Sequence, residues 1–233
     1  MGYWSYYVLS ILLAYALQNP AAAVLALVFW LCRGFLPDPV VWLRTMGRMS
    51  KLRADIQLNP SNMVATRDLA RLYLERKRPK KAIELIEHTR QRMAVSTRHP
   101  QGSLDDAELL LQLGVARMQL GEPEAALEPL VAAIAIAPDV GRGDPYMLAS
   151  DALSKLGRWE EAEDSLDRFV TKNQSSVQAY VKLARVRAKR KDDAGSKDAI
   201  TQAKHTWAVL PSFIRRREWP WYLAALASPL WLF

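Results

Sequence analysis

The stretch AELLLQLGVARMQLGEPEAALEPLVAAIAIAPDV, residues 107–140, decides the fold. Apolar residues recur in it at helical spacing on both sides of Gly121-Glu122-Pro123, which predicts two helices joined by a turn. A glycine at position 121 ends the first helix where a positive φ is wanted, and Ala126 lets the two helices approach closely. Each helix has one apolar stripe that a single hairpin cannot bury. The stretch therefore predicts one unit of a stacked array of helices.

The same frame fits three further segments, so that four units are expected at 63–96, 107–140, 143–176 and 177–210. The residues that repeat the pattern are Leu69, Ala70, Tyr73, Ala82 and Ile86 in the first unit, Leu113, Gly114, Gly121, Ala126, Leu130, Ala133 and Pro138 in the second, Tyr146, Leu153, Gly157, Ala162, Leu166 and Phe169 in the third, and Tyr180, Leu183, Ala184, Ile200 and Ala203 in the fourth. This pattern resembles the tetratricopeptide repeat family, over roughly residues 54–210. The resemblance implies an α-solenoid of about four helix-turn-helix repeats, more than the roughly three that a stable stack needs.

The register slips at two places, which predicts loops there. The first two units start at residues 63 and 107, further apart than one repeat length, and residues 96–103 have the composition of an inserted loop. A smaller insertion lies near Gly141. The fourth unit departs from the pattern at Ser196, where the family has a small alanine against the neighbouring helix. Residues 37–62, before the array, are expected to form a linker or an amphipathic capping helix.

Both ends of the chain are apolar. Residues 1–32 contain no Lys, Arg, Asp or Glu, and residues 219–233 are also uncharged and contain three tryptophans. Since a helix needs roughly 20 apolar residues to cross a bilayer, residues 1–36 are expected to be embedded in a membrane. They form either a hairpin of two short helices or one span kinked at Pro20. A cleaved secretory signal is a further alternative, although the segment lacks a basic leading region.

Basic residues flank both apolar segments, which favours the cytoplasmic side of a membrane for the repeats. Residues 211–233 are expected to form a basic, aromatic, membrane-associated tail, or else a helix that packs on the protein itself. The residues predicted to lie at the membrane surface are Arg44, Arg48, Lys51, Arg215, Arg216, Arg217, Trp219 and Trp221. The expected location is therefore integral to a membrane, the bacterial inner membrane, with the repeats facing the cytoplasm and membrane lipid as a partner.

The resemblance also implies a groove that binds protein partners. In this family the first helix of each repeat lines a concave surface, and the residues at the lining positions are Arg67, Arg71, Leu74 and Glu75, then Glu108, Leu111, Val115 and Met118, then Met147, Asp151 and Lys155, and finally Gln178, Val181, Arg185 and Lys189. This surface is basic at both ends and apolar or acidic in the middle. It suits a peptide with an extended apolar stretch, unless the protein's own tail fills it. The carboxylate clamp of chaperone-binding members is not matched, so chaperone binding is not predicted.

Composition argues against several other functions. One cysteine cannot form an internal disulfide, the three histidines lack ligand spacing, and no nucleophile motif, phosphate loop or nucleotide fingerprint occurs. An enzyme, a cofactor and a metal site are therefore not expected. The net charge of +8 is unevenly spread: residues 107–142 hold two basic and five acidic residues, and residues 177–233 hold eleven and four. The basic clusters lack interleaved aromatic residues, which argues against nucleic acid as a partner.

The sequence thus predicts an all-α protein, a repeat solenoid with an N-terminal hydrophobic helical hairpin and a C-terminal hydrophobic helix. Its expected function is that of a membrane-anchored scaffold that binds and recruits or assembles partner proteins. The basic ends and the acidic centre would let the array rest on anionic lipid like an arch. The alternative is an accessory structural subunit of a larger membrane complex, packed against membrane-protein subunits.

Overall fold

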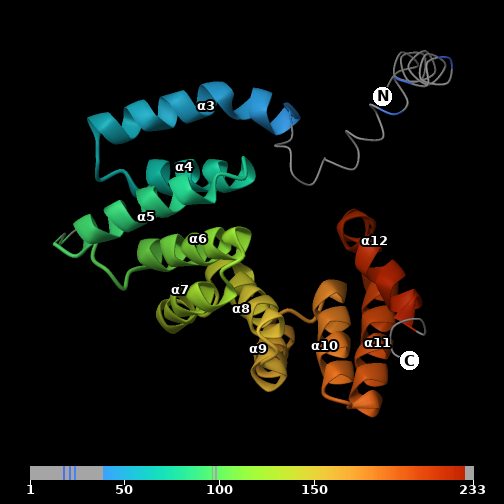
Figure 1. Ribbon diagram of the computed structural model, residues 1–233. Helices are drawn as coiled ribbons and strands as arrows, with labels where there is room; N and C mark the ends of the chain where they lie inside the picture. Colours follow the sequence, from blue (N-terminus) through green and yellow to red (C-terminus); the bar gives the residue numbers. More distant parts are fainter. Residues whose placement is uncertain are drawn as a thin grey trace. The chain divides into compact units, whose positions relative to one another are not determined.

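The computed structural model describes residues 39–228 except Ser96 and Arg98, together with the isolated positions Gln18, Ala21 and Val24. These residues form ten α-helices, one short 3-10 helix and no strand (Figure 1). The elements are α3 (Pro39–Leu58), α4 (Met63–Glu75), α5 (Pro79–Met93), α6 (Leu104–Leu120), α7 (Pro123–Ile136), η1 (Val140–Gly143), α8 (Asp144–Lys155), α9 (Trp159–Lys172), α10 (Val177–Lys189), α11 (Asp193–Val209) and α12 (Ser212–Leu226). The chain divides into two units, Met1–Ser50 and Lys51–Phe233. The predicted all-α solenoid is confirmed, and it lies in the second unit.

Helices α4 to α11 form four consecutive hairpins, α4/α5, α6/α7, α8/α9 and α10/α11 (Figure 1). In two of them the turn after the first helix uses glycine in the left-handed region, with φ +79° at Gly121 and +75° at Gly157, as predicted. Lys77 and Lys191 take the same conformation at the same place in the other two repeats, with φ values of 52° and 65°. All four hairpins therefore share one turn geometry, and two of them adopt it without glycine.

Small residues allow the two helices of each hairpin to pack closely. Ala82, Ala126 and Ala162, at the predicted contact position near the start of the second helix, are completely buried. Ser196 holds this position in the last hairpin, and it too is completely buried. Its hydroxyl donates to the backbone carbonyl of Ala184 at 2.8 Å. A buried serine is tolerated here because its polar atom has a hydrogen-bond partner.

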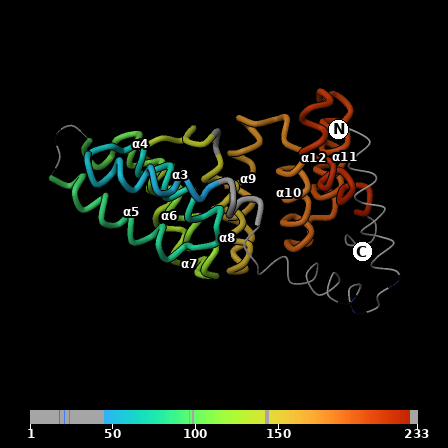
Figure 2. The backbone as a smooth tube through the Cα atoms, turned by 90° about the horizontal axis from the view of Figure 1, so that it is seen from above, coloured from blue at the N-terminus to red at the C-terminus, as the bar shows by residue number. Residues whose placement is uncertain are grey.

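The C-terminal helix α12 packs on α10 and α11, as both views show (Figures 1 and 2). The ring of Tyr222 stacks on Trp207 of α11, with centroids 4.4 Å apart and an interplanar angle of 6°. The buried carboxylate of Glu218 accepts a hydrogen bond from the backbone N–H of Gln178, in the first turn of α10, at 3.0 Å. Carboxylates are favourable at a helix N-terminus, where backbone N–H groups lack partners. Helix α12 therefore caps the end of the array.

The expectation of an integral membrane protein is contradicted. In the described part of the chain no helix is both long and apolar enough to cross a bilayer. Two aromatic residues of the tail, Trp221 and Tyr222, pack against the core of the last repeats. The predicted inner-membrane location and cytoplasmic orientation are therefore wrong. The apolar segment 1–36 lies outside the described residues, apart from Gln18, Ala21 and Val24.

All eight residues predicted to meet the membrane surface lie on α3 and α12. The side chain of Arg44 and everything beyond residue 228 fall outside the described part. On α3, Arg48 and Lys51 are exposed. On α12, Arg216 is exposed, Arg217 pairs with Glu218 at 3.4 Å, and Trp219 is 53% exposed. Arg215 donates to the Ala208 carbonyl at 2.8 Å and lies 5.9 Å from the centre of the Trp207 ring, so it holds α12 to α11.

Candidate protein-binding face

The predicted groove residues lie on the first helices of the hairpins, α4, α6, α8 and α10. Helix α4 packs directly against α6, and α6 against α8. These helices are amphipathic, so the side that does not face its hairpin partner remains at the surface. We call the surface formed by the predicted positions on these four helices the inner face.

Two ion pairs join neighbouring first helices across the inner face. Arg67 of α4 pairs with Glu108 of α6, both with about a third of the side chain exposed. Lys182 of α10 donates to Asp151 of α8 at 2.7 Å. The side chain of Gln112 adds a hydrogen bond to the Arg67 carbonyl at 3.2 Å. The predicted groove residues Arg67, Glu108 and Asp151 are therefore engaged within the protein. Their ion pairs fix the spacing of the first helices.

The middle of the inner face is apolar. Leu111, Val115 and Met118 on α6 and Met147 on α8 are half-buried. Leu111 and Met118 pack on the cluster of Ala126, Leu130 and Ala149 beneath them. Because α6 and α8 are in contact, these four half-buried side chains lie on two adjacent helices. We call these four residues the apolar strip.

Two predicted groove residues belong to the core instead. Leu74 is 7% exposed, and Val181 is completely buried. Val181 packs in the cluster that joins the third and fourth repeats, with Leu153, Leu166 and Ile200 among its members. A side chain at this depth cannot contact a ligand, so the predicted groove is narrower than the family pattern implied.

The charged residues at the two ends of the inner face are more accessible. Arg71 and Glu75 form an ion pair at 3.3 Å on the surface of α4. Lys155 and Lys189 are exposed at the ends of α8 and α10. Arg185 is exposed and lies 5.8 Å from the centre of the Trp221 ring, a distance at which a cation and an aromatic face attract each other. The protein's own tail therefore covers part of α10, as the alternative interpretation held.

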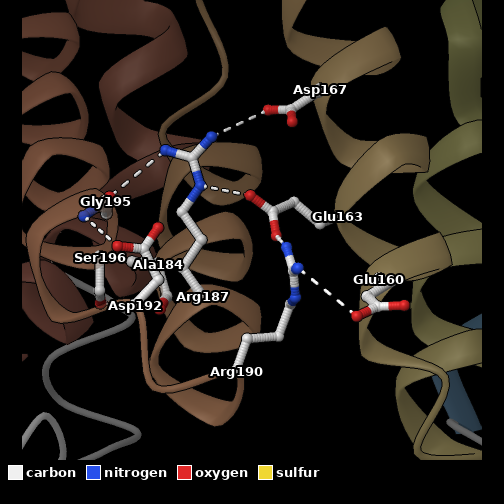
Figure 3. Close-up of polar contacts among 9 residues, drawn as sticks. All are labelled: Glu160, Glu163, Asp167, Ala184, Arg187, Arg190, Asp192, Gly195 and Ser196. Atoms are coloured by element: carbon white, nitrogen blue, oxygen red, sulfur yellow. Dashed lines mark hydrogen bonds and ion pairs between the residues drawn. The ribbon is translucent and has the colours of Figure 1, made fainter.

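An arginine of α10 ties the last two repeats together (Figure 3). Arg187 donates to Glu163 of α9 at 2.8 Å, to Asp167 at 3.3 Å and to the Gly195 carbonyl at 3.3 Å. Arg190 pairs with Glu163 as well. Burial raises the pKa of Asp167 above its usual value, and the attraction of Arg187 only partly offsets this. The sequence analysis did not predict this cluster, because it weighed the basic residues as contacts for lipid or nucleic acid and not for neighbouring repeats.

The repeat frame contained a signal for this cluster. Arg117 and Arg187 occupy the same place in the second and fourth units, where the family pattern has tyrosine. Arg117 likewise reaches back to the preceding repeat, donating to Glu87 of α5 at 3.1 Å, and it also binds Glu122 at 3.0 Å. A recurring cation at one repeat position, opposite an acid on the preceding helix, predicts an ionic contact between repeats.

Residues 147–204 match the family model described as tetratricopeptide repeat. Over these residues the chain has the pattern of tetratricopeptide repeats. Repeats of this family bind protein partners or peptides. The predicted protein partner is therefore supported at this level. No curated protein sequence matches the chain.

Several solved structures share the fold. The crystal structure of MamA is 18% identical, covers 70% of this chain and 91% of its own, and superposes with a TM-score of 0.59. The structure of YrrB, a repeat protein with an unusual peptide-binding site, is 14% identical. It covers 80% of this chain and 86% of its own, with a TM-score of 0.59. TTC0263, a thermophilic repeat protein of Thermus thermophilus, is 19% identical, with coverages of 80% and 95% and a TM-score of 0.55. At these identities the likeness establishes the fold alone.

Proposed function

We propose that the protein is a scaffold that binds an extended segment of a partner protein along the inner face. The apolar strip carries this proposal. Its four side chains are held on two adjacent helices, are half-buried from below and keep one side in contact with solvent. Methionine is unbranched and adaptable, so Met118 and Met147 can adjust to the side chains of a ligand.

The charges around the apolar strip define the ligand further. Arg67 and Asp151 are already paired with residues of neighbouring helices. Replacing them would alter the packing of the helices and would not report on contacts with a ligand. Lys155, Arg185 and Lys189 are exposed and basic. The best ligand is therefore an extended segment with a central apolar stretch and acidic residues toward the end that approaches α10. The solved structure of YrrB is described as having a peptide-binding site, which supports a peptide ligand for this fold.

The test is fluorescence anisotropy with labelled twelve-residue peptides that have an apolar centre and either acidic or basic flanks. We expect the acid-flanked peptide to bind more tightly. Val115→Asp should weaken binding at least tenfold, which corresponds to about 1.4 kcal/mol. Met147→Gln provides a second, milder variant in case the first unfolds the repeat. Val209→Asp, the same substitution at a position that is 70% exposed on α11, is the matched control.

Two outcomes would contradict the proposal. One is equal binding of all the peptides, and the other is an equal effect of the inner-face variant and its control. If the protein were instead a fixed structural subunit, mild purification from its source would yield a constant, stoichiometric assembly, and short peptides would not bind.

A further inference from the structure

A groove lies between α7 and α9, lined by residues other than those of the inner face. It has a volume of about 1350 Å³ and is lined by α7, α8, α9 and the turn before α9. We call it the α7/α9 groove. Ordinary small-molecule pockets measure roughly 300–1,000 Å³. The groove is therefore large enough for a segment of a macromolecule.

The floor and one wall of the α7/α9 groove are apolar. Tyr146, Ala149 and Leu153 of α8 form the floor, and Leu127 and Val131 belong to the wall on α7. Val131 is 58% exposed. Helix α7, with the sequence PEAALEPLVAAIAI, contains no basic residue and is apolar on more than the side that faces its hairpin partner. A helix with this composition is normally covered, and an apolar patch with a polar rim marks an interaction site.

The rim of the groove is acidic. Five carboxylates line it, namely Glu124, Glu128, Glu160, Glu161 and Asp164, against the two cations Arg158 and Arg168. Both cations are engaged by rim carboxylates: Arg158 donates two hydrogen bonds to Glu161, at 2.7 and 2.6 Å, and Arg168 donates to Asp164 at 2.9 Å. The bond from Arg158 holds the pKa of Glu161 below its usual value, so this carboxylate stays ionised in mildly acidic solution. The rim thus has a net negative charge and complements a basic ligand.

The walls favour a helical ligand over an extended one. An extended segment gains its main-chain hydrogen bonds from an exposed sheet edge, whereas α7 and α9 have their backbone groups paired within the helices. A helix satisfies its own backbone and presents side chains at i, i+3, i+4 and i+7 to a groove. Helix α7 has 14 residues, a length of about 21 Å. The groove can therefore hold about four turns of helix.

We propose that the α7/α9 groove docks an amphipathic helix of a partner protein, with its apolar stripe on Leu153 and Val131 and with flanking lysines or arginines against the acidic rim. This surface is separate from the apolar strip and selects the opposite ligand charge. The scaffold can thus hold two different segments at once, an extended one on the inner face and a basic helix in the α7/α9 groove.

The test uses the full chain and a designed sixteen-residue helical peptide that has a leucine stripe flanked by lysines. Its two controls are a scrambled peptide of the same composition and a peptide with glutamates in place of the lysines. Isothermal titration calorimetry at low and moderate salt should show binding of the lysine peptide alone, weakened by salt. Val131→Asp and Glu128→Lys should each weaken binding at least tenfold. Glu84→Lys, the same charge reversal at an exposed site on α5, should leave binding within twofold.

The proposal is overturned if the lysine peptide fails to bind, if the scrambled peptide binds equally well, or if Glu84→Lys weakens binding as much as Glu128→Lys. Self-association of the wild-type chain that Val131→Asp abolishes would also overturn it, by identifying the occupant as a second copy with its basic helix α12. Failure at the inner face is distinguishable, because Val115→Asp should leave binding of the lysine peptide unchanged.

Discussion

Replacing Arg187 with alanine should loosen the contact between the third and fourth repeats. The side chain of Arg187 is 19% exposed and that of Glu163 is 13% exposed, so their hydrogen bond at 2.8 Å is mostly shielded from water. A hydrogen bond to a charged group contributes roughly 1.5–3 kcal/mol. In Arg187→Ala, Glu163 keeps its second partner, Arg190, so the larger cost of an unpaired buried charge does not apply. We expect a loss of about 2 kcal/mol.

The position of the effect along the chain is as informative as its size. In a repeat stack each unit contacts only its neighbours, so weakening one interface uncouples the parts on its two sides. Native-state hydrogen exchange should show protection of the amides of α10, α11 and α12 falling about 30-fold, the factor that corresponds to about 2 kcal/mol. Protection in α4 to α7 should change little. Urea unfolding followed by tryptophan fluorescence should begin at a lower concentration, because Trp207 and Trp221 belong to the uncoupled part.

Arg168→Ala is the matched control. Arg168 pairs with Asp164 on the surface of α9, where both side chains are more than 60% exposed, and such pairs contribute less than about 0.5 kcal/mol. If Arg187→Ala costs no more than this control, the ionic cluster does not couple the repeats. A uniform fall of protection over all helices would refute the idea that the cost is confined to one interface.

Three further substitutions test packing, capping and charge. Gly114→Ala places a Cβ 2.5 Å from Cδ2 of the fully buried Leu130, and overpacking of this kind should cost about 1–3 kcal/mol by urea unfolding; an unchanged midpoint would show that Leu130 can move. Glu218→Ala removes the acceptor for the Gln178 N–H, so near-ultraviolet circular dichroism should show the aromatic signal of the docked α12 lost at a lower temperature than the far-ultraviolet signal. Burial raises the pKa of Asp167, so the fold is favoured when this group is protonated, and the contribution is lost as pH rises through the raised pKa. Asp167→Asn should therefore be at least as stable as the wild type at pH 7. This gain in stability should be absent below about pH 3.8, where the wild-type carboxyl is itself protonated. Lower stability of the variant at pH 7 would show that the hydrogen bond from Arg187 outweighs the desolvation of Asp167.

The repeat period was readable from the sequence because it reflects sterics. A close helix crossing needs a small residue, and Ala126 and Ala162 marked two of those crossings correctly. The turns were only half readable. At Gly121 and Gly157 the residue type predicts a positive φ, whereas Lys77 and Lys191 adopt a positive φ that their residue type does not predict. In those turns the packing of the two helices imposes a backbone conformation that the residue does not itself prefer.

The functional surfaces were harder to predict, because composition does not say what covers an apolar residue. The aromatic composition of the tail is compatible with a membrane interface and with a protein core. In the structure, the ring of Trp221 on α12 lies beside Lys182 of α10. Family positions placed Val181 in the groove, but it is completely buried. The α7/α9 groove was not anticipated, although the composition of α7 was its signal.

Part of the uneven charge of the chain, first attributed to lipid, is explained by ion pairs between repeats. Residues 143–176 contain four basic and seven acidic residues, and residues 177–233 contain eleven and four. Adjacent repeats of opposite sign attract, and the contacts are visible as the bonds of Lys182 to Asp151 and of Arg187 to Glu163. Those pairs involve Asp151 of α8 and Glu163 of α9, and Glu160 of the α7/α9 groove also pairs with Arg190 of α10, at 3.6 Å. The other groove acids, Glu124, Glu128, Glu161 and Asp164, are a separate, exposed group. Glu124 also pairs with Arg158 across the second and third repeats, at 3.8 Å. The five groove acids still outnumber the two groove cations, and the proposal of a basic helical partner depends on this surplus.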